Sequence, residues 1–333
     1  MKKILSLLLL LVLSIFTVAC SQSSPTETAS TTSADKQETK PSSDFPNKTI
    51  EMIVPTPPGG GADTLARILA QHANKYLPNG QNVVIVNKPG GNATIGVSEV
   101  FKAKPDGYTI GFVPTGPLVE EPHYGNTPYS HDSFQTIMRV SQQDGLFYVR
   151  SDSPWQTYEE WLQYVKENPG KFKVGTISST KYTLERLNHD ADIEMKIVPF
   201  EGFAESTTAL LGKHVEGIFS IPTAVKAQLQ TGEFKPLFSS SSRDVGVPLL
   251  KDNGINISEA KVNGIIAPKG ISDDVLTILH DAFKKTLEDP EVIEQFRKVD
   301  SEPYYAGPEE YQKILSDGFE QSGETLRILG YIK

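Results

Sequence analysis

Cysteine is almost absent from this 333-residue sequence, because Cys20 is the only one. No intramolecular disulfide can therefore form, and packing alone must stabilise the folded chain. Long hydrophobic runs are equally scarce. After Phe16 no run reaches the roughly 20 apolar residues that a membrane-spanning helix needs, so the body of the chain is predicted to be soluble.

The patterns that mark catalytic and metal sites are also missing. The six histidines do not have the paired spacing of metal ligands, and there is no His-Glu-x-x-His run. A Gly-x-Ser-x-Gly elbow, a Walker loop and a Gly-x-Gly-x-x-Gly fingerprint are absent as well. The sequence thus predicts a protein that is not an enzyme and that holds no metal and no cofactor.

The first residues have the layout of a bacterial export signal. A basic start precedes an apolar run that ends at Phe16, and small residues then lead to Cys20. This predicts a lipoprotein signal peptide over 1–19 and diacylation of the Cys20 sulfur, although Thr17 stands where lipid boxes usually have Leu. Two acyl chains would anchor the protein stably at the outer face of the cell membrane, in the periplasm if the cell has an outer membrane. The alternative is an ordinary signal peptide and a soluble exported protein.

Residues 20–44 are predicted to be a flexible tether, because they are rich in Ser, Thr, Glu and Lys and poor in apolar residues. The folded body then begins near Phe45, and its length allows two lobes with separate cores. Loss of Lys2 and Lys3 with the signal peptide leaves 30 basic against 41 acidic residues, a net charge near −11. This charge argues against nucleic acid and against polybasic membrane docking.

Strand-like and helix-like segments alternate along the body. Short apolar runs predict strands at 49–54, 82–86, 108–113, 145–149, 172–175, 196–199, 215–219, 234–238 and 264–267. Helical spacing predicts helices at 65–76, 95–103, 158–167, 203–211, 224–230, 273–287, 290–298 and 308–329. The alternation indicates the α/β class, with mainly parallel sheets flanked by helices.

Several motifs follow one another in a fixed order. The first is 54–67 (VPTPPGGGADTLAR), and the others are 87–92 with Gly96, 104–109, 168–172, Gly202 with 210–212, 267–270 and 289–292. In order and spacing they resemble the substrate-binding proteins of tripartite tricarboxylate transporters, the TctC/Bug family, over essentially 45–333. The resemblance implies a two-lobed periplasmic binding protein fold of type II-like form. Its lobes, 45–147 plus 264–333 and 148–263, would close on a ligand in the cleft between them.

The resemblance also implies a function. The chain would capture a small organic carboxylate, such as a tricarboxylate or a dicarboxylate, for uptake. Its partners would be a large and a small integral membrane subunit of the transporter, and it would be a monomer. Two alternatives remain: a sensor subunit that presents its ligand to a signalling receptor, and an exported enzyme whose nucleophile or metal is not visible in the sequence.

The turn after the first predicted strand has the features of an anion site. It reads Pro57, Pro58, Gly59, Gly60, Gly61 and joins a strand to a helix, so its amides meet the positive end of the helix dipole. Alone, such a turn is more often structural, but the resemblance favours binding. Asp63 is interpreted as the helix N-cap rather than a ligand contact, because a carboxylate would repel an anion; it stays among the candidate residues.

On the second lobe the resemblance assigns the site to two turns, with helix caps and ordinary loops as the alternative. Their candidate residues are Ser178, Ser179 and Thr180 in the first turn, and Glu201, Gly202, Phe203 and Ala204 in the second. The first turn lacks the glycine-rich motif that is common in the family, and it also lacks the histidine that follows this motif in relatives.

Glu201 stands where relatives often have Lys or Gly. If it faces the cleft it would pair with a cationic group of the ligand, and otherwise it is a solvated loop charge. Thr115, Gly116 and Ser220 follow other predicted strands and are further candidates. Phe147 could form a wall for the ligand, but core packing explains it equally well.

Overall fold

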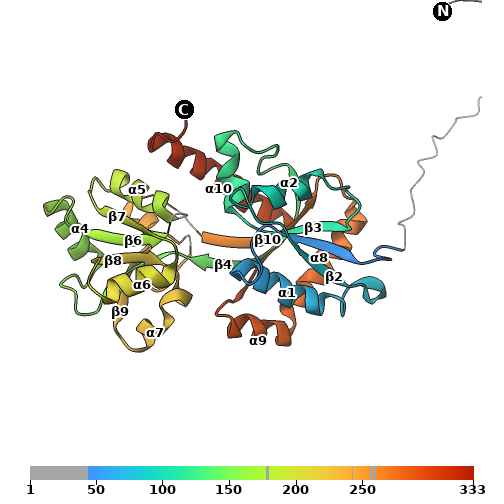
Figure 1. Ribbon diagram of the computed structural model, residues 1–333, viewed down its shortest axis with the longest axis horizontal. Helices are drawn as coiled ribbons and strands as arrows, with labels where there is room; N and C mark the ends of the chain where they lie inside the picture. The colour runs from blue at the N-terminus through green and yellow to red at the C-terminus, as the bar shows by residue number, and fades with distance from the viewer. Residues whose placement is uncertain (1–43, 178–179, 242, 256, 258–259) are drawn as a thin grey trace, which may run out of the picture. The chain divides into compact units, whose positions relative to one another are not determined.

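The computed structural model describes residues 44–177, 180–241, 243–255, 257 and 260–333. They belong to the compact unit Ser42–Lys333, whose strands form two sheets (Figure 1). The predicted signal peptide, Cys20 and nearly all of the predicted tether lie outside the described residues, as do Ser178 and Ser179.

The first sheet has the strand order β11-β4-β10-β3-β1-β2. β1 pairs in parallel with β2 and β3, whereas β10 is antiparallel to β3 and β4, and β11 is antiparallel to β4. The strands are β1 (Ile50–Val54), β2 (Val83–Asn87), β3 (Thr109–Pro114), β4 (Phe134–Asp144), β10 (Ala260–Pro268) and β11 (Pro303–Ala306).

The second sheet has the order β7-β6-β8-β5-β9. β6 pairs in parallel with β7 and β8, and β5 is antiparallel to β8 and β9. The strands are β5 (Leu146–Arg150), β6 (Lys173–Ile177), β7 (Lys196–Phe200), β8 (Gly217–Ser220) and β9 (Phe234–Ser239).

Both sheets are thus mixed, and the prediction of mainly parallel sheets is wrong. A strand covered on both faces is an apolar run whichever way its neighbours run, so the pattern did not reveal the direction of β5 or β10. Two antiparallel strands of the first sheet, β4 and β11, were not predicted at all.

Helices cover both faces of each sheet (Figure 1). On the first sheet α1, α8 and α9 share one core, and α2, α3 and α10 share the other; on the second, α4 and α5 pack opposite α6 and α7. Their bounds are α1 (Gly61–Ala73), α2 (Thr94–Lys102), α3 (Gly116–Val119), α4 (Tyr158–Glu167), α5 (Lys181–Asp190), α6 (Phe203–Leu211), α7 (Lys226–Gln230), α8 (Asp273–Glu288), α9 (Pro290–Lys298) and α10 (Pro308–Ile328). Short 3-10 helices are η1 (Pro78–Gly80), η2 (Glu121–Tyr124), η4 (Pro222–Val225) and η5 (Leu250–Asn253).

Side-chain caps define the ends of several helices. Thr157 accepts the Glu160 N–H at the start of α4, Ser272 accepts the Val275 N–H at the start of α8, and Asp289 accepts the Glu291 N–H before α9. These signals are local, which is why the predicted helices 158–167 and 290–298 agree residue for residue with α4 and α9. α5 was missed because Thr183 and Arg186 lie on its buried face and interrupt the apolar spacing.

The chain passes from one sheet to the other through a single residue, Gly145, between β4 and β5. A Cβ at Gly145 would lie 2.4 Å from the Phe219 ring, so the close contact requires glycine. The chain returns to the first sheet before β10 begins. The predicted crossing points at 148 and 264 therefore fall inside β5 and β10.

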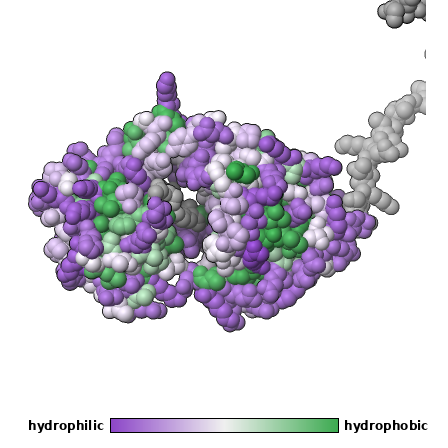
Figure 2. Space-filling view, in the orientation of Figure 1, coloured by the Kyte–Doolittle hydropathy of each residue, from purple (hydrophilic) through white to green (hydrophobic). Residues whose placement is uncertain are grey.

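The surface in Figure 2 is hydrophilic over much of this face, and hydrophobic residues form separate patches. Among the described residues, no helix combines the length and the apolar character that crossing a membrane requires.

Candidate functional site

The carboxyl ends of the parallel strands define one edge of the first sheet. β1, β2 and β3 end there at Val54, Asn87 and Pro114. Pro114 pairs with Asn263 of β10, and the first residue of β10 pairs with Asp144, the last residue of β4. The end of β4 therefore lies at the same edge.

The second sheet also has a carboxyl edge, and this edge lies at the crossover, Gly145, where the chain passes between the sheets. Leu146, the first residue of β5, pairs with Ser220 at the end of β8 and with Ser239 at the end of β9. β6 is parallel to β8 and ends at Ile177. Because only Gly145 separates β4 from β5, the carboxyl edges of both sheets adjoin the crossover, and open α/β sheets bind ligands beyond such edges.

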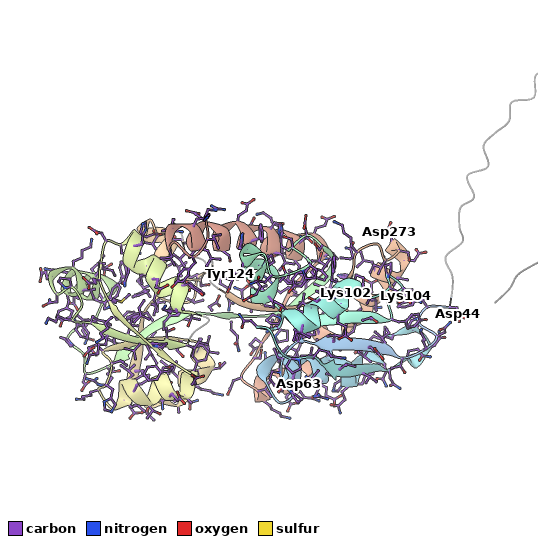
Figure 3. All side chains as sticks on the ribbon, turned by 45° about the horizontal axis from the view of Figure 1, so that its top comes forward. Asp44, Asp63, Lys102, Lys104, Tyr124 and Asp273 are labelled. Carbon is purple, nitrogen blue, oxygen red and sulfur yellow. The ribbon has the colours of Figure 1, made fainter. Side chains whose placement is uncertain are left out.

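Figure 3 distinguishes the two ends of the first sheet. Asp63 and Tyr124, which follow the carboxyl ends of β1 and β3, lie toward the crossover, whereas Asp44 and Lys104, which precede the amino ends, lie at the far end. The predicted first-lobe residues are therefore at the end of the sheet where a ligand would bind.

The turn 57–61 is bent by its own backbone. Gly59 has a φ of +82°, a conformation that favours glycine, and the Gly60 N–H donates to the Pro57 carbonyl at 3.3 Å. Gly60 is the N-cap of α1. The amides of 61–63 have no intrahelical acceptor, and no acceptor for them occurs among the described residues. They are available to an anion at the positive end of the α1 dipole.

Asp63 holds this turn in place. The Asp63 side chain is 2% exposed and accepts hydrogen bonds from the Gly59 N–H (2.8 Å), Arg67 Nε (2.9 Å) and Asn87 Nδ2 (2.8 Å). Burial alone would raise the pKa of Asp63, but the hydrogen bonds from Arg67, Gly59 and Asn87 together outweigh it and hold the pKa below its ordinary value.

The interpretation of Asp63 as the N-cap is wrong. It is the third residue of α1, and its side chain accepts the N–H of Gly59, one residue before the N–H that the same position accepts in a capping box. Sequence reasoning also missed Asn87, which bonds to Asp63, to Arg67 and to the Thr56 carbonyl. The position of Asn87 at the start of the second motif was the available signal.

The first candidate turn of the second sheet is 178–180, and of these residues the structure describes Thr180. It is the N-cap of α5, and its hydroxyl bonds to the Thr176 hydroxyl and the Ile177 carbonyl. The Thr180 side chain thus closes the turn on the end of β6. Ser178 and Ser179 lie outside the described residues, so their predicted role stays a prediction.

The second turn, 201–204, leads into α6. Gly202 is the extended N-cap, and the Glu201 N–H donates to the Glu205 carboxylate at 3.2 Å. The Glu201 side chain is exposed, Phe203 is half-buried and Ala204 is exposed. This is the same back-bonding arrangement as between Gly59 and Asp63, here at the opposite sheet.

Thr115 and Gly116 lie at the carboxyl end of β3, half-buried. The Thr115 N–H donates to the Val262 carbonyl at 3.0 Å, and Thr115 is the N-cap of the four-residue α3. A Cβ at Gly116 would lie 3.7 Å from a carboxylate oxygen of Glu120. The Glu120 carboxylate therefore lies over this candidate position.

The remaining two candidates differ in their surroundings. Phe147 has no exposed surface and stacks on Phe238, with ring centroids 4.6 Å apart, so its side chain packs in the core, as the alternative interpretation held. Ser220 is 1% exposed at the end of β8, and its hydroxyl has no hydrogen-bond partner among the described residues.

Tyr124 and Tyr182 were not predicted and lie beside the candidate turns. Tyr124 ends η2, which follows α3, and Tyr182 is the second residue of α5. Their hydroxyls are 3.4 Å apart. No sequence pattern indicated this pair, because the two tyrosines are 58 residues apart. No group of His, Cys, Asp and Glu suited to a metal ion occurs in the described ranges.

Comparisons with known proteins identify the family and the fold of the chain. Residues 65–331 match the family model described as tripartite tricarboxylate transporter family receptor, TctC. A "UPF0065 protein in gbd 5′ region" of Cupriavidus necator is 31% identical, over 87% of this chain and 90% of the relative. A TctC solute-binding protein from Polaromonas, solved without ligand, superposes with a TM-score of 0.79 at 30% identity, over 85% of this chain and 99% of that one. MatC from Rhodopseudomonas palustris with bound malate shares the fold, with a TM-score of 0.64 at 20% identity, over 85% of this chain and 100% of that one.

Proposed function

This chain belongs to the tripartite tricarboxylate transporter receptor family, and we propose that it captures a small organic carboxylate for uptake. The family consists of extracytoplasmic solute-binding receptors rather than enzymes. The proposed partners are the large and the small integral membrane subunits of such a transporter. Malate bound to a protein of the same fold supports a carboxylate as the ligand class.

The observation that carries the proposal is the set of free amides at 61–63. They follow a glycine turn fixed by Asp63 and lie at the sheet edge that adjoins the crossover. A carboxylate at this position would accept hydrogen bonds from these amides. The helix dipole would contribute about 0.3 to 1 kcal/mol to its binding free energy. A micromolar ligand needs about 8 kcal/mol, so further contacts from the turns of the second sheet are required, which favours a cleft that closes around the ligand.

The proposed site therefore draws on both sheets. From the first sheet it takes the turn 57–61, Thr115 and Gly116, with Asp63 as a positioning residue. From the second it takes 178–180, the turn 201–204 and Ser220. The Phe147 side chain is not part of the proposed contact surface, because it is enclosed by the core.

Thermal unfolding of the protein without residues 1–43 tests the ligand class. A carboxylate at a hundred times its Kd is expected to stabilise the fold by about 2.7 kcal/mol, whereas the matched amide is expected to leave the Tm unchanged. Calorimetric titration of each ligand checks the result. Equal stabilisation by acids and their amides, or no response to any acid by a folded protein, would refute anion capture.

A sensor subunit is the second candidate function, since it would use the same fold and site. Deleting the gene distinguishes the two functions. Uptake of the labelled ligand is expected to fall to the background of a transporter deletion. Normal uptake together with loss of ligand-induced gene expression would establish sensing instead.

We propose further that the mature protein is held at the membrane by acyl chains on Cys20, with the tether as a spacer. Cys20→Ser is expected to abolish incorporation of a labelled fatty acid, because serine has no thiol to carry the diacyl group and the variant therefore lacks the diacyl anchor. Membrane fractionation and metabolic labelling with a fatty acid provide the measurement, with Ser21→Ala as the control. An unlabelled wild-type protein would show that the signal peptide is an ordinary one.

A further inference from the structure

Two phenol groups meet beside the proposed site, one from each sheet. Tyr124 comes from the segment after β3 and α3, and Tyr182 comes from the first turn of α5, two residues beyond Thr180. Both side chains are half-buried, and their hydroxyl oxygens are 3.4 Å apart. Neither tyrosine has a place in the proposed carboxylate cradle at 61–63.

The hydroxyl pair retains hydrogen-bonding capacity. O–H···O bonds are usually 2.7 to 2.8 Å long, so a separation of 3.4 Å is a weak bond that a third polar group can replace or complete. Burial, and then the bond to Tyr182, raise the pKa of Tyr124 above its ordinary value. The phenol therefore stays protonated at neutral pH and can both donate and accept.

A residue near the C-terminus of the chain, Tyr331, packs against Tyr182. The Tyr182 ring packs edge-on against Tyr331 with centroids 5.1 Å apart, and the Tyr331 hydroxyl bonds to Glu185 at 3.1 Å. Arg186, buried in α5, also pairs with Glu324 of α10 at 3.1 Å. The ring contact with Tyr331 restrains the Tyr182 side chain without occupying its hydroxyl.

The charges around the pair are negative. Glu120 and Glu121 come just before Tyr124 in the chain, the Glu120 carboxylate lies over Gly116, and the field of both glutamates acts on Tyr124. A second carboxylate of a ligand would be repelled by these groups.

Carboxylates of the protein already pair with described basic side chains near the turns, which weakens the attraction of these cations for a second carboxylate of the ligand. Lys181 bonds to Glu185 at 2.9 Å, and Arg67 bonds to Asp63 at 2.9 Å. The other pairs are Lys88 with Glu99, Lys226 with Asp300 and Arg243 with Asp144.

We propose that Tyr124 and Tyr182 are specificity-determining residues that bind the end of the ligand opposite its carboxylate, and that this end is a hydroxyl, amide or ammonium group rather than a second carboxylate. The inference rests on the proposed function, whose amide cradle at 61–63 takes the single carboxylate. Two neutral hydroxyls in a negative environment can accept from and donate to such a group.

A matched ligand series tests this inference on the mature, full-length chain. The series contains succinate, glutarate and adipate, together with the ω-hydroxy acid, ω-amide acid and ω-amino acid of each length and the plain monocarboxylate. At the best chain length, one of the three ω-substituted acids is expected to bind at least tenfold more tightly than the dicarboxylate. Tighter binding of the dicarboxylate at every length overturns the inference.

Variants separate ligand contact from a purely structural bridge. Tyr124→Phe and Tyr182→Phe keep both rings and are expected to weaken the preferred ω-substituted acid about tenfold while leaving the monocarboxylate unchanged; Tyr305→Phe, on the edge strand β11, is the matched control. Equal weakening for both ligands, or no weakening, would identify the pair as a structural bridge and overturn the inference. If no member of the series binds the folded wild-type protein, the proposed function itself fails.

Discussion

Gly60→Val is expected to weaken carboxylate binding by about a hundredfold, which corresponds to about 2.7 kcal/mol. The free amides at 61–63 can be reached only if the ligand approaches the backbone of the turn, and branched methyl groups at the N-cap would stand in that path. The backbone itself tolerates a side chain, because Gly60 has a φ of −72°. Titration calorimetry with the preferred acid measures the loss.

The change is expected to affect binding far more than folding. A Cβ at Gly60 would lie 3.3 Å from the Pro57 carbonyl oxygen, which a small shift of the turn can relieve, so the Tm should fall by only a few degrees. Gly318→Ala is the control, since a Cβ there makes an ordinary contact with Val119 at 3.5 Å. Wild-type affinity in a folded Gly60→Val protein would remove this turn from the site.

Asp63→Asn is expected to lower the free energy of unfolding by about 2 kcal/mol at pH 7, the range of hydrogen bonds to a charged group. The variant loses the carboxylate that accepts hydrogen bonds from Arg67 and the Gly59 N–H. Its amide group also places an N–H donor against another donor, from Asn87 or Arg67. The turn would lose its support from α1, so ligand affinity should fall with stability. Urea unfolding with and without ligand measures both effects.

The pH dependence of this effect has a definite sign. The pKa of Asp63 is lower in the folded protein than its ordinary value, so its stabilising contribution is present above the unfolded value of about 3.9. This contribution is lost as the pH falls through the lower, folded pKa. The difference between wild type and Asp63→Asn should therefore be constant from pH 7 to 5 and shrink below about pH 4. Asp274→Asn, at an exposed position, is the control; a difference that does not change with pH would contradict the proposed role of the charge.

Many of the elements could be predicted from the sequence because their signals are local. The buried run Ile50–Val54 and the capped helices α4 and α9 are examples. β4 was missed although it is the longest strand of the first sheet among the described residues. Its buried residues include Thr136, Arg139 and Ser141, and a strand with polar residues in the core does not read as an apolar run.

The candidate site was predictable in part for the same reason. The turn 57–61 consists of consecutive residues, and its glycines and prolines indicate a turn directly. The residues that hold this turn are distant in the sequence, since Asn87 reaches Asp63 from the end of another strand. Tyr124 and Tyr182 are farther apart still, and only folding brings their hydroxyls together.

The sequence by itself therefore determined the α/β class, the first strand with its turn and the helix after it, and the family resemblance, because each depends on spacing within short segments. Tertiary structure alone decided the direction of β5 and β10, the crossover at Gly145 and the partners of Asp63. It also decided which charges and hydroxyls lie near the candidate turns. The physical reason is that these features depend on contacts between residues that are distant in the sequence. Local propensity does not predict strand pairing, burial of a carboxylate or the contact of two phenols.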